Sequence, residues 1–135
     1  MAELALTAAE RTFLEALEDL GVRYMVVGLT AAVMQGADTV TADIDLWFAD
    51  RGDPRIHDGD ALGDRFDVVL TLSGLDAFEV EARSALAIEV DGLALPVLPL
   101  ERIIHSKRVA GRRKDLAVLP ALEAALAAAR DPEAT

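Results

Sequence analysis

The chain contains no cysteine and only two histidines, His57 and His105, among its 135 residues. The absence of cysteine excludes a disulfide framework and a thiolate metal site, and two histidines are too few for a histidine-rich one. Any metal that this chain holds is therefore held mainly by carboxylate oxygens, a donor set that suits magnesium or manganese.

Long apolar runs are also missing. The N-terminal stretch MAELALTAAE lacks a basic start followed by an apolar segment, and no apolar stretch reaches the length of a membrane-spanning helix. We therefore expect a cytoplasmic protein without a membrane partner. Hydrophobic residues make up 53% of the chain, which is enough for a real core, so we predict a single domain over residues 1–135.

Positive charge is scarce. Thirteen Lys and Arg residues against 24 Asp and Glu residues give a net charge of −11, which argues against a general nucleic-acid binder because phosphates are bound mainly by Lys and Arg. The charges are nevertheless separated along the chain. Eight acidic residues lie between positions 43 and 67, whereas six basic residues lie between 102 and 114. This basic segment still allows a local contact between the protein and tRNA.

Local signals predict the elements of the fold. Thr7 and Glu10 form a capping-box pattern ahead of a helix over about 8–19, and Gly21 stands at its C-terminal end. The other predicted elements are a strand over 22–27, a helix over 31–35, a second strand within 41–50, a third strand over 66–72, a hairpin that turns at Asp91-Gly92, and helices over 99–110 and 113–128. The last residues, ARDPEAT, are predicted to be frayed. The predicted fold class is α/β (α+β), with a small mixed β-sheet flanked by helices.

The stretch TADIDLWFAD, residues 41–50, places two aspartates on one face of a predicted strand. Side chains alternate along a strand, so Asp43 and Asp45 share a face and lie roughly 7 Å apart. They repel each other unless solvent and counter-ions or a bound metal lie between them. Asp67 opens the next predicted strand, so three carboxylates converge if those strands are neighbours. The alternative is a set of solvated residues on the polar face of a sheet.

Four segments carry a family resemblance. In order along the chain they are YMVVGLTAAVMQG, TADIDLWF, FDVVL and IIHSKRVAGRRKDLAVLPAL. Together they resemble the DNA polymerase beta-like nucleotidyltransferase superfamily, particularly its small bacterial members associated with toxin-antitoxin or abortive-infection systems. The resemblance covers nearly the whole chain and implies a nucleotidyltransferase-like fold. It places Gly28 at the end of the first strand, Asp43 and Asp45 as paired metal ligands, and Asp67 as the third carboxylate.

The predicted nucleotide-binding residues lie in two places. Glycine lets a backbone approach a phosphate closely, and a helix start offers unpaired N–H groups, so Gly28 and Thr30 are predicted to cradle the β- and γ-phosphates. Otherwise Gly28 only ends a strand in a tight turn. Basic side chains that neutralise the triphosphate are expected from the late segment, unless these residues form a solvated helix face: Lys107, Arg112, Arg113 and Lys114.

Two further residues, Asp115 and Trp47, are expected to have mainly structural roles. Asp115 is expected to cap the last helix or to pair with Lys114. Trp47 shares the predicted strand face of Asp45 and is expected in the core or at its rim, with stacking on a base as the alternative.

The sequence thus predicts a metal-dependent nucleotidyltransferase. It would transfer a nucleoside monophosphate from an NTP, with Mg²⁺ or Mn²⁺, to a hydroxyl of a tRNA end, a protein or a small molecule. Leu29 stands where the family usually has a second Gly or a Ser, and only 21 residues separate Asp45 from Asp67. These departures favour the alternative functions, a non-catalytic partner protein of the antitoxin or scaffold type, or a nucleotide-binding sensor.

Overall fold

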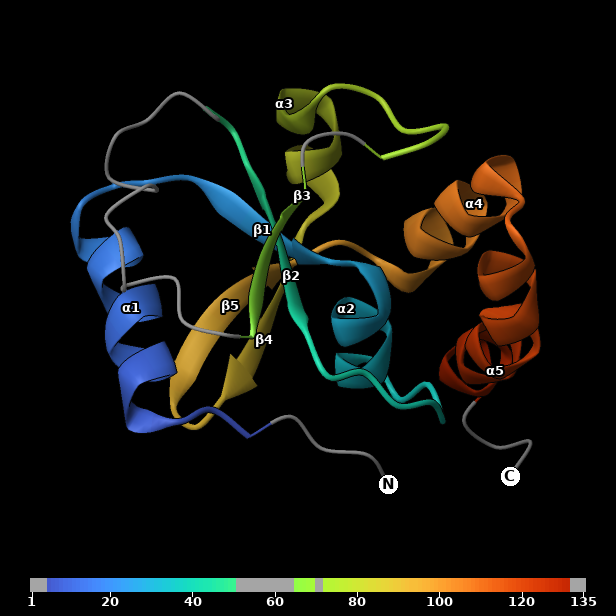
Figure 1. The fold of residues 1–135 in the computed structure, drawn as a ribbon, viewed down its shortest axis with the longest axis horizontal. Helices are drawn as coiled ribbons and strands as arrows, with labels where there is room; N and C mark the ends of the chain where they lie inside the picture. The colour runs from blue at the N-terminus through green and yellow to red at the C-terminus, as the bar shows by residue number, and fades with distance from the viewer. Residues whose placement is uncertain (1–4, 51–64, 70–71, 132–135) are drawn as a thin grey trace.

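The computed structural model describes residues 5–50, 65–69 and 72–131. Its elements, labelled in Figure 1 where there is room, are α1 (Ala8–Asp19), β1 (Tyr24–Val27), α2 (Gly28–Met34), β2 (Ile44–Phe48), β3 (Phe66–Val69), α3 (Phe78–Glu81), the 3-10 helix η3 (Ala82–Ser84), β4 (Leu86–Val90), β5 (Leu93–Val97), α4 (Leu100–Ala110) and α5 (Arg113–Arg130). Among these described residues, no helix is long and apolar enough to cross a membrane.

The five strands form one mixed sheet in the order β3-β2-β1-β5-β4. The β1/β2 and β4/β5 pairs are antiparallel, whereas β1/β5 and β2/β3 are parallel. Helix α1 lies on one side of the sheet, and α2, α4 and α5 lie on the other (Figure 1). The structure therefore confirms the predicted mixed α/β class, with a small mixed sheet flanked by helices.

Helix α1 has the predicted ends. The Thr7 hydroxyl accepts a hydrogen bond from the Glu10 backbone N–H, and the Glu10 carboxylate accepts one from the Thr7 N–H, so the capping box is complete. At the other end Gly21, with φ of +70°, donates to the carbonyl of Glu18, and the Val22 N–H donates to that of Leu17. This is the hydrogen-bond pattern of a Schellman motif. Because Val22 completes the helix end, β1 begins at Tyr24 and not at the predicted residue 22.

The hairpin at Asp91-Gly92 is confirmed. Both residues have positive φ, +51° and +81°, as a two-residue type I′ turn requires. The register pairs Val90 with Leu93 and Leu86 with Val97.

Other boundaries also differ from the prediction. Helix α2 begins at Gly28, three residues earlier than predicted, because the glycine adopts φ of +66° and starts the helix directly after β1. Helix α5 continues to Arg130, two residues further than predicted. Helix α3 and η3 were not predicted, since residues 78–84 carry no strong local signal. The predicted third strand is seen over Phe66–Val69, and residues 70–71 of it lie outside the described part.

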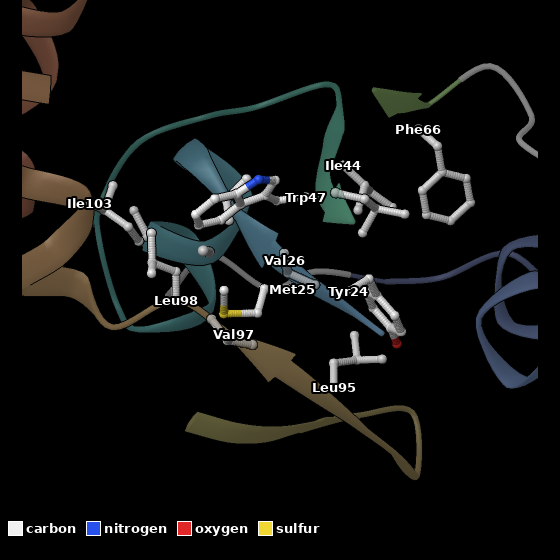
Figure 2. Packing of buried hydrophobic residues seen from close by; sticks show 14 of the residues in the cluster. Tyr24, Met25, Val26, Ile44, Trp47, Phe66, Leu95, Val97, Leu98 and Ile103 are labelled. Atoms are coloured by element: carbon white, nitrogen blue, oxygen red, sulfur yellow. The ribbon is translucent and has the colours of Figure 1, made fainter. Parts of the chain in front are cut away.

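The buried side chains form one hydrophobic cluster that reaches from α1 to α5. On the α1 side of the sheet, Phe13 packs against Phe66 with ring centroids 5.1 Å apart, and Tyr24 packs against Phe48 at 6.2 Å. Figure 2 shows Tyr24 and Phe66 on this side, with Trp47 on the opposite side of the sheet. Each large apolar side chain removed from water stabilises the fold by about 1.5–3 kcal/mol.

Candidate functional site

The three predicted carboxylates come from the β2 and β3 side of the sheet. Strand β2 pairs with β3 in parallel, and the register places Asp45 directly beside Asp67. Paired residues in a sheet point to the same face, so both side chains lie on the face that α2 covers. Asp43 comes just before β2; it and Asp67 are exposed, and Asp45 is half-buried. The expected neighbourhood of the two strands is therefore confirmed.

Gly28 is in contact with this carboxylate group. A Cβ atom at position 28 would lie 2.3 Å from Oδ2 of Asp45, far inside van der Waals contact. Glycine is therefore favoured at this position for two reasons. One is the close approach of Asp45, and the other is a φ of +66°, which lies in the region that only glycine adopts without strain. The absence of a side chain here lets the Asp45 carboxylate lie against the β1–α2 turn.

Thr30 has a structural partner. Its side chain is fully buried, and its hydroxyl donates to the backbone carbonyl of Asp43. This hydrogen bond fixes the segment that precedes β2 against α2. The structure therefore gives the Thr30 hydroxyl a buried backbone partner at Asp43.

The charge around Asp45 is strongly negative. Burial, and then the neighbouring charges of Asp67 and Asp43, raise the pKa of the Asp45 carboxyl to about 6, while the ammonium group of Lys107 opposes the rise. An additional positive charge at this place would stabilise the ionised form. Among the residues that the structure describes, no three acidic or histidine side chains are gathered closely enough to hold a metal ion together.

A cavity of about 320 Å³ lies beside Gly28. Its wall is formed on one side by Gly28 and by the segment after β3, including Ser73, and on the other side by α4 and the start of α5. The lining side chains from α4 and from the start of α5 with its N-cap residue are Ser106, Lys107, Arg112, Asp115, Ile103 and Ala110. The cavity therefore offers two cations, the carboxylate that pairs with them, two hydroxyls and an apolar surface in one place.

Asp115 holds the two cations of this cavity. It is fully buried, and it accepts hydrogen bonds from Nζ of Lys107 at 3.2 Å and from Nε of Arg112 at 2.6 Å. It also accepts from the backbone N–H of Arg112, at 3.2 Å, and so caps α5 as expected. These bonds, chiefly those of Arg112, keep the pKa of the Asp115 carboxyl below its ordinary value. Lys107, whose side chain is only 20% exposed, is therefore not the solvated helix cation of the alternative interpretation.

The basic segment divides into two groups. Lys107 and Arg112 line the cavity, whereas Arg113 and Lys114 lie exposed on the first turn of α5 and do not line it. Ser73 and Ser106 were missed by the sequence analysis, because a single serine in a loop or a helix carries no distinctive signal. No sequence signal distinguished Arg112 from its neighbours Arg113 and Lys114.

Trp47 belongs to the core. Its side chain is 6% exposed, and its ring meets Phe78 of α3 edge to face with centroids 5.3 Å apart. The core interpretation is therefore correct, and the indole is not available to stack on a base.

Comparisons with models of protein families, with curated proteins and with solved structures found no match to this chain.

Proposed function

We propose that the protein is a metal-dependent nucleotidyltransferase that transfers a nucleoside monophosphate from an NTP to a hydroxyl acceptor. The observation that carries this proposal is the register of the sheet, which sets Asp45 beside Asp67 and against Gly28. The cavity that Gly28 lines also holds Lys107 and Arg112. Carboxylates and cations at adjacent positions suit a ligand that combines a divalent metal with a polyphosphate.

The donor chemistry fits magnesium or manganese. Asp43, Asp45 and Asp67 supply only oxygen ligands, and the raised pKa of Asp45 reflects a local excess of negative charge. We assign metal binding to Asp43 and Asp45, with Asp67 completing the site. Because the three carboxylates are not gathered closely in the described structure, the metal would draw them together on binding. When bound, the metal would neutralise phosphate oxygens and the developing charge on the leaving pyrophosphate.

The chain's own groups have separate roles in the proposed reaction. The acceptor oxygen forms a bond to the α-phosphorus of the NTP, the bond from that phosphorus to the bridging oxygen breaks, and pyrophosphate leaves. Asp67, which is exposed, completes the site as a metal ligand or as the base that takes the proton of the acceptor hydroxyl. Lys107 and Arg112 face the triphosphate and offset its charge. The acceptor classes are a tRNA end, a protein hydroxyl or a small molecule.

Nucleotide binding without turnover is the second candidate function. Its support is Leu29, which packs partly buried against the hydrophobic core at the position where the resembling family has Gly or Ser. A sensor or an antitoxin-like partner protein of this kind would bind an NTP and release no pyrophosphate.

The test is a pyrophosphate-release assay with each labelled NTP, Mg²⁺ or Mn²⁺, and bulk tRNA, protein extract or an aminoglycoside as acceptor. We expect release by the wild type and by the control Asp19→Asn, which changes an exposed carboxylate at the end of α1 on the other side of the sheet. Asp67→Asn should abolish release while the chain remains folded. Background release by the folded wild type under every condition would contradict the enzyme and favour the binding protein.

A further inference from the structure

The edge strand β4 exposes apolar residues and unpaired backbone groups. In the part of the chain that the structure describes, β4 is paired on one side only, with β5. Its sequence is LAIEV, in which Leu86 is 43% exposed and Ile88 is half-buried. Edge strands of stable monomers are commonly protected by lysine, proline or a bulge. The segment Leu86–Val90 contains no lysine or proline.

The register shows which backbone groups face outward. Leu98 donates its N–H to Val26 of β1 at 3.0 Å, so residue 98, and with it the alternate residue Pro96, turns its backbone groups toward β1. Residues Leu95 and Val97 therefore face β4 and form the hydrogen-bonded pairs with Ile88 and Leu86. The N–H and C=O groups of Ala87 and Glu89 consequently point away from β5, toward the open edge.

We infer that a second copy of this chain pairs with β4 in antiparallel orientation, about a two-fold axis at Ile88. This register places Ala87 opposite the partner's Glu89, and the same pair recurs on the other side of the axis. All four outward groups of each strand are then hydrogen-bonded, in two pairs of N–H to C=O bonds. The two sheets join into one continuous sheet. This inference is independent of the proposed nucleotidyl transfer.

Charge and apolar contacts select this register over its neighbours. A two-fold axis at residue 89 would set the two Glu89 carboxylates directly opposite each other, which is unfavourable. An axis at residue 87 would leave both Glu89 residues beyond the paired segment. With the axis at Ile88, the two Ile88 side chains meet on the face that α1 covers, and each Leu86 lies opposite the partner's Val90. Apolar side chains that are partly exposed in the monomer then become buried.

A cysteine scan tests the register directly, because the natural chain has no cysteine. In the proposed dimer the two residues at position 88 form a non-hydrogen-bonded pair with Cα atoms about 4.5 Å apart, a distance that a disulfide spans. Residues at position 86 lie four strand positions apart, roughly 13 Å, which no disulfide spans. Under mild oxidation, Ile88→Cys should form a disulfide-linked dimer, whereas the more exposed control Leu86→Cys should remain monomeric on a non-reducing gel.

Sedimentation across a concentration series gives the second readout. The wild-type mass should rise from 14.4 kDa toward twice that value, and more readily at high salt, because each chain carries a net charge of −11. Ala87→Pro removes an outward N–H and no bond to β5, so it should stay monomeric and folded. If it does not fold, Ile88→Lys is the second variant, because it places two cations next to each other at the two-fold axis of the dimer. Its control is Leu116→Lys, on the exposed side of α5.

Two results would overturn the inference. One is a wild type that stays at 14.4 kDa at every concentration and salt level, which would leave the edge to a different protein or to no partner. The other is a dimer that persists equally in Ile88→Lys and Leu116→Lys, or that cross-links equally through positions 86 and 88.

Discussion

Asp45 is the residue on which the site depends, and its environment is unfavourable to its own charge. It lies beside Asp67, contacts the backbone at Gly28, and has a carboxyl pKa raised to about 6. A folded protein accepts such a cost where function needs it, since removing a functional charge often increases stability. The same residue therefore permits a test through stability as well as activity.

Replacing Asp45 by Asn should stabilise the metal-free protein above pH 6. The folded-state pKa of about 6 exceeds the ordinary value of 3.8. The contribution of Asp45 to the free energy of unfolding is therefore fully present below pH 4, and it is lost as the pH rises to 6. Asp45→Asn avoids the loss, so at pH 7.5 with a chelator it should be more stable by about 1 kcal/mol, after allowance for solvent screening.

The measurement is chemical denaturation of both proteins from pH 4 to pH 8. A variant that is less stable than the wild type at pH 7.5 would show that Asp45 makes favourable contacts, and the assigned charge repulsion would be incorrect.

Lys107 links the carboxylates to the cavity. Lys107→Ala should weaken NTP binding, because the ammonium group lies near Asp45 and lines the cavity. It should also lower stability by about 1 kcal/mol, because Asp115 keeps Arg112 as its remaining partner but loses one charged hydrogen bond. Arg130→Ala is the control, since Arg130 forms an exposed ion pair with Glu101. Equal loss of NTP affinity in both variants would indicate a nonspecific effect of charge.

At the scale of elements, the sequence predicted those that depend on local signals. The capping box of Thr7 and Glu10 and the turn at Asp91-Gly92 involve residues close in the chain, and both are present in the structure. The sheet order depends on contacts between distant segments, so no local pattern revealed the β1/β5 pair. The contact between Gly28 and Asp45 likewise joins segments that are distant in the chain, so no local pattern revealed it.

The site residues divide in the same way, into those that local sequence identified and those that only the fold brings together. The sequence identified three carboxylates and a basic segment. It predicted that the carboxylates converge only if their two strands are neighbours. It did not distinguish Lys107 and Arg112 from the exposed Arg113 and Lys114, because their orientation depends on the buried Asp115 and on the angle between α4 and α5. Ser73 was not identified, since it belongs to a loop that the fold brings beside α4.

The close approach of Gly28 to Asp45 can be measured by a matched pair of variants. Gly28→Ala and Gly21→Ala both place a side chain at a φ near +70°, and each should cost about 1 kcal/mol in backbone strain. Only Gly28→Ala also meets the Asp45 carboxylate, whereas a Cβ at Gly21 meets nothing within 4 Å. Gly28→Ala should therefore be the more destabilising in thermal denaturation.

The double variant Gly28→Ala, Asp45→Ala supplies the control for this contact. Removing the carboxylate should bring the cost of Gly28→Ala close to that of Gly21→Ala. An unchanged cost in the absence of the Asp45 carboxylate would contradict the contact.

At the scale of the whole molecule, negative charge dominates. A net charge of −11 opposes compaction, although several of the basic residues are engaged in ion pairs, including Arg102 with the buried Glu81 at 2.8 Å. We expect sodium chloride to raise the melting temperature of the metal-free protein, since salt screens long-range repulsion more than the partly buried pairs. A melting temperature that falls with salt would show instead that the ion pairs contribute more than the repulsion costs.

Calorimetric titration of each NTP, with and without magnesium, tests the central claim most directly. That claim is that the Asp45–Asp67 group and the Lys107–Arg112 pair form one site for a metal and a polyphosphate. We predict binding of at least one NTP by the wild type that requires magnesium, persists in Asp19→Asn and is lost in Asp45→Asn. NTP binding that is the same without magnesium, or unchanged in folded Asp45→Asn, would contradict the site, as would the absence of binding by any NTP.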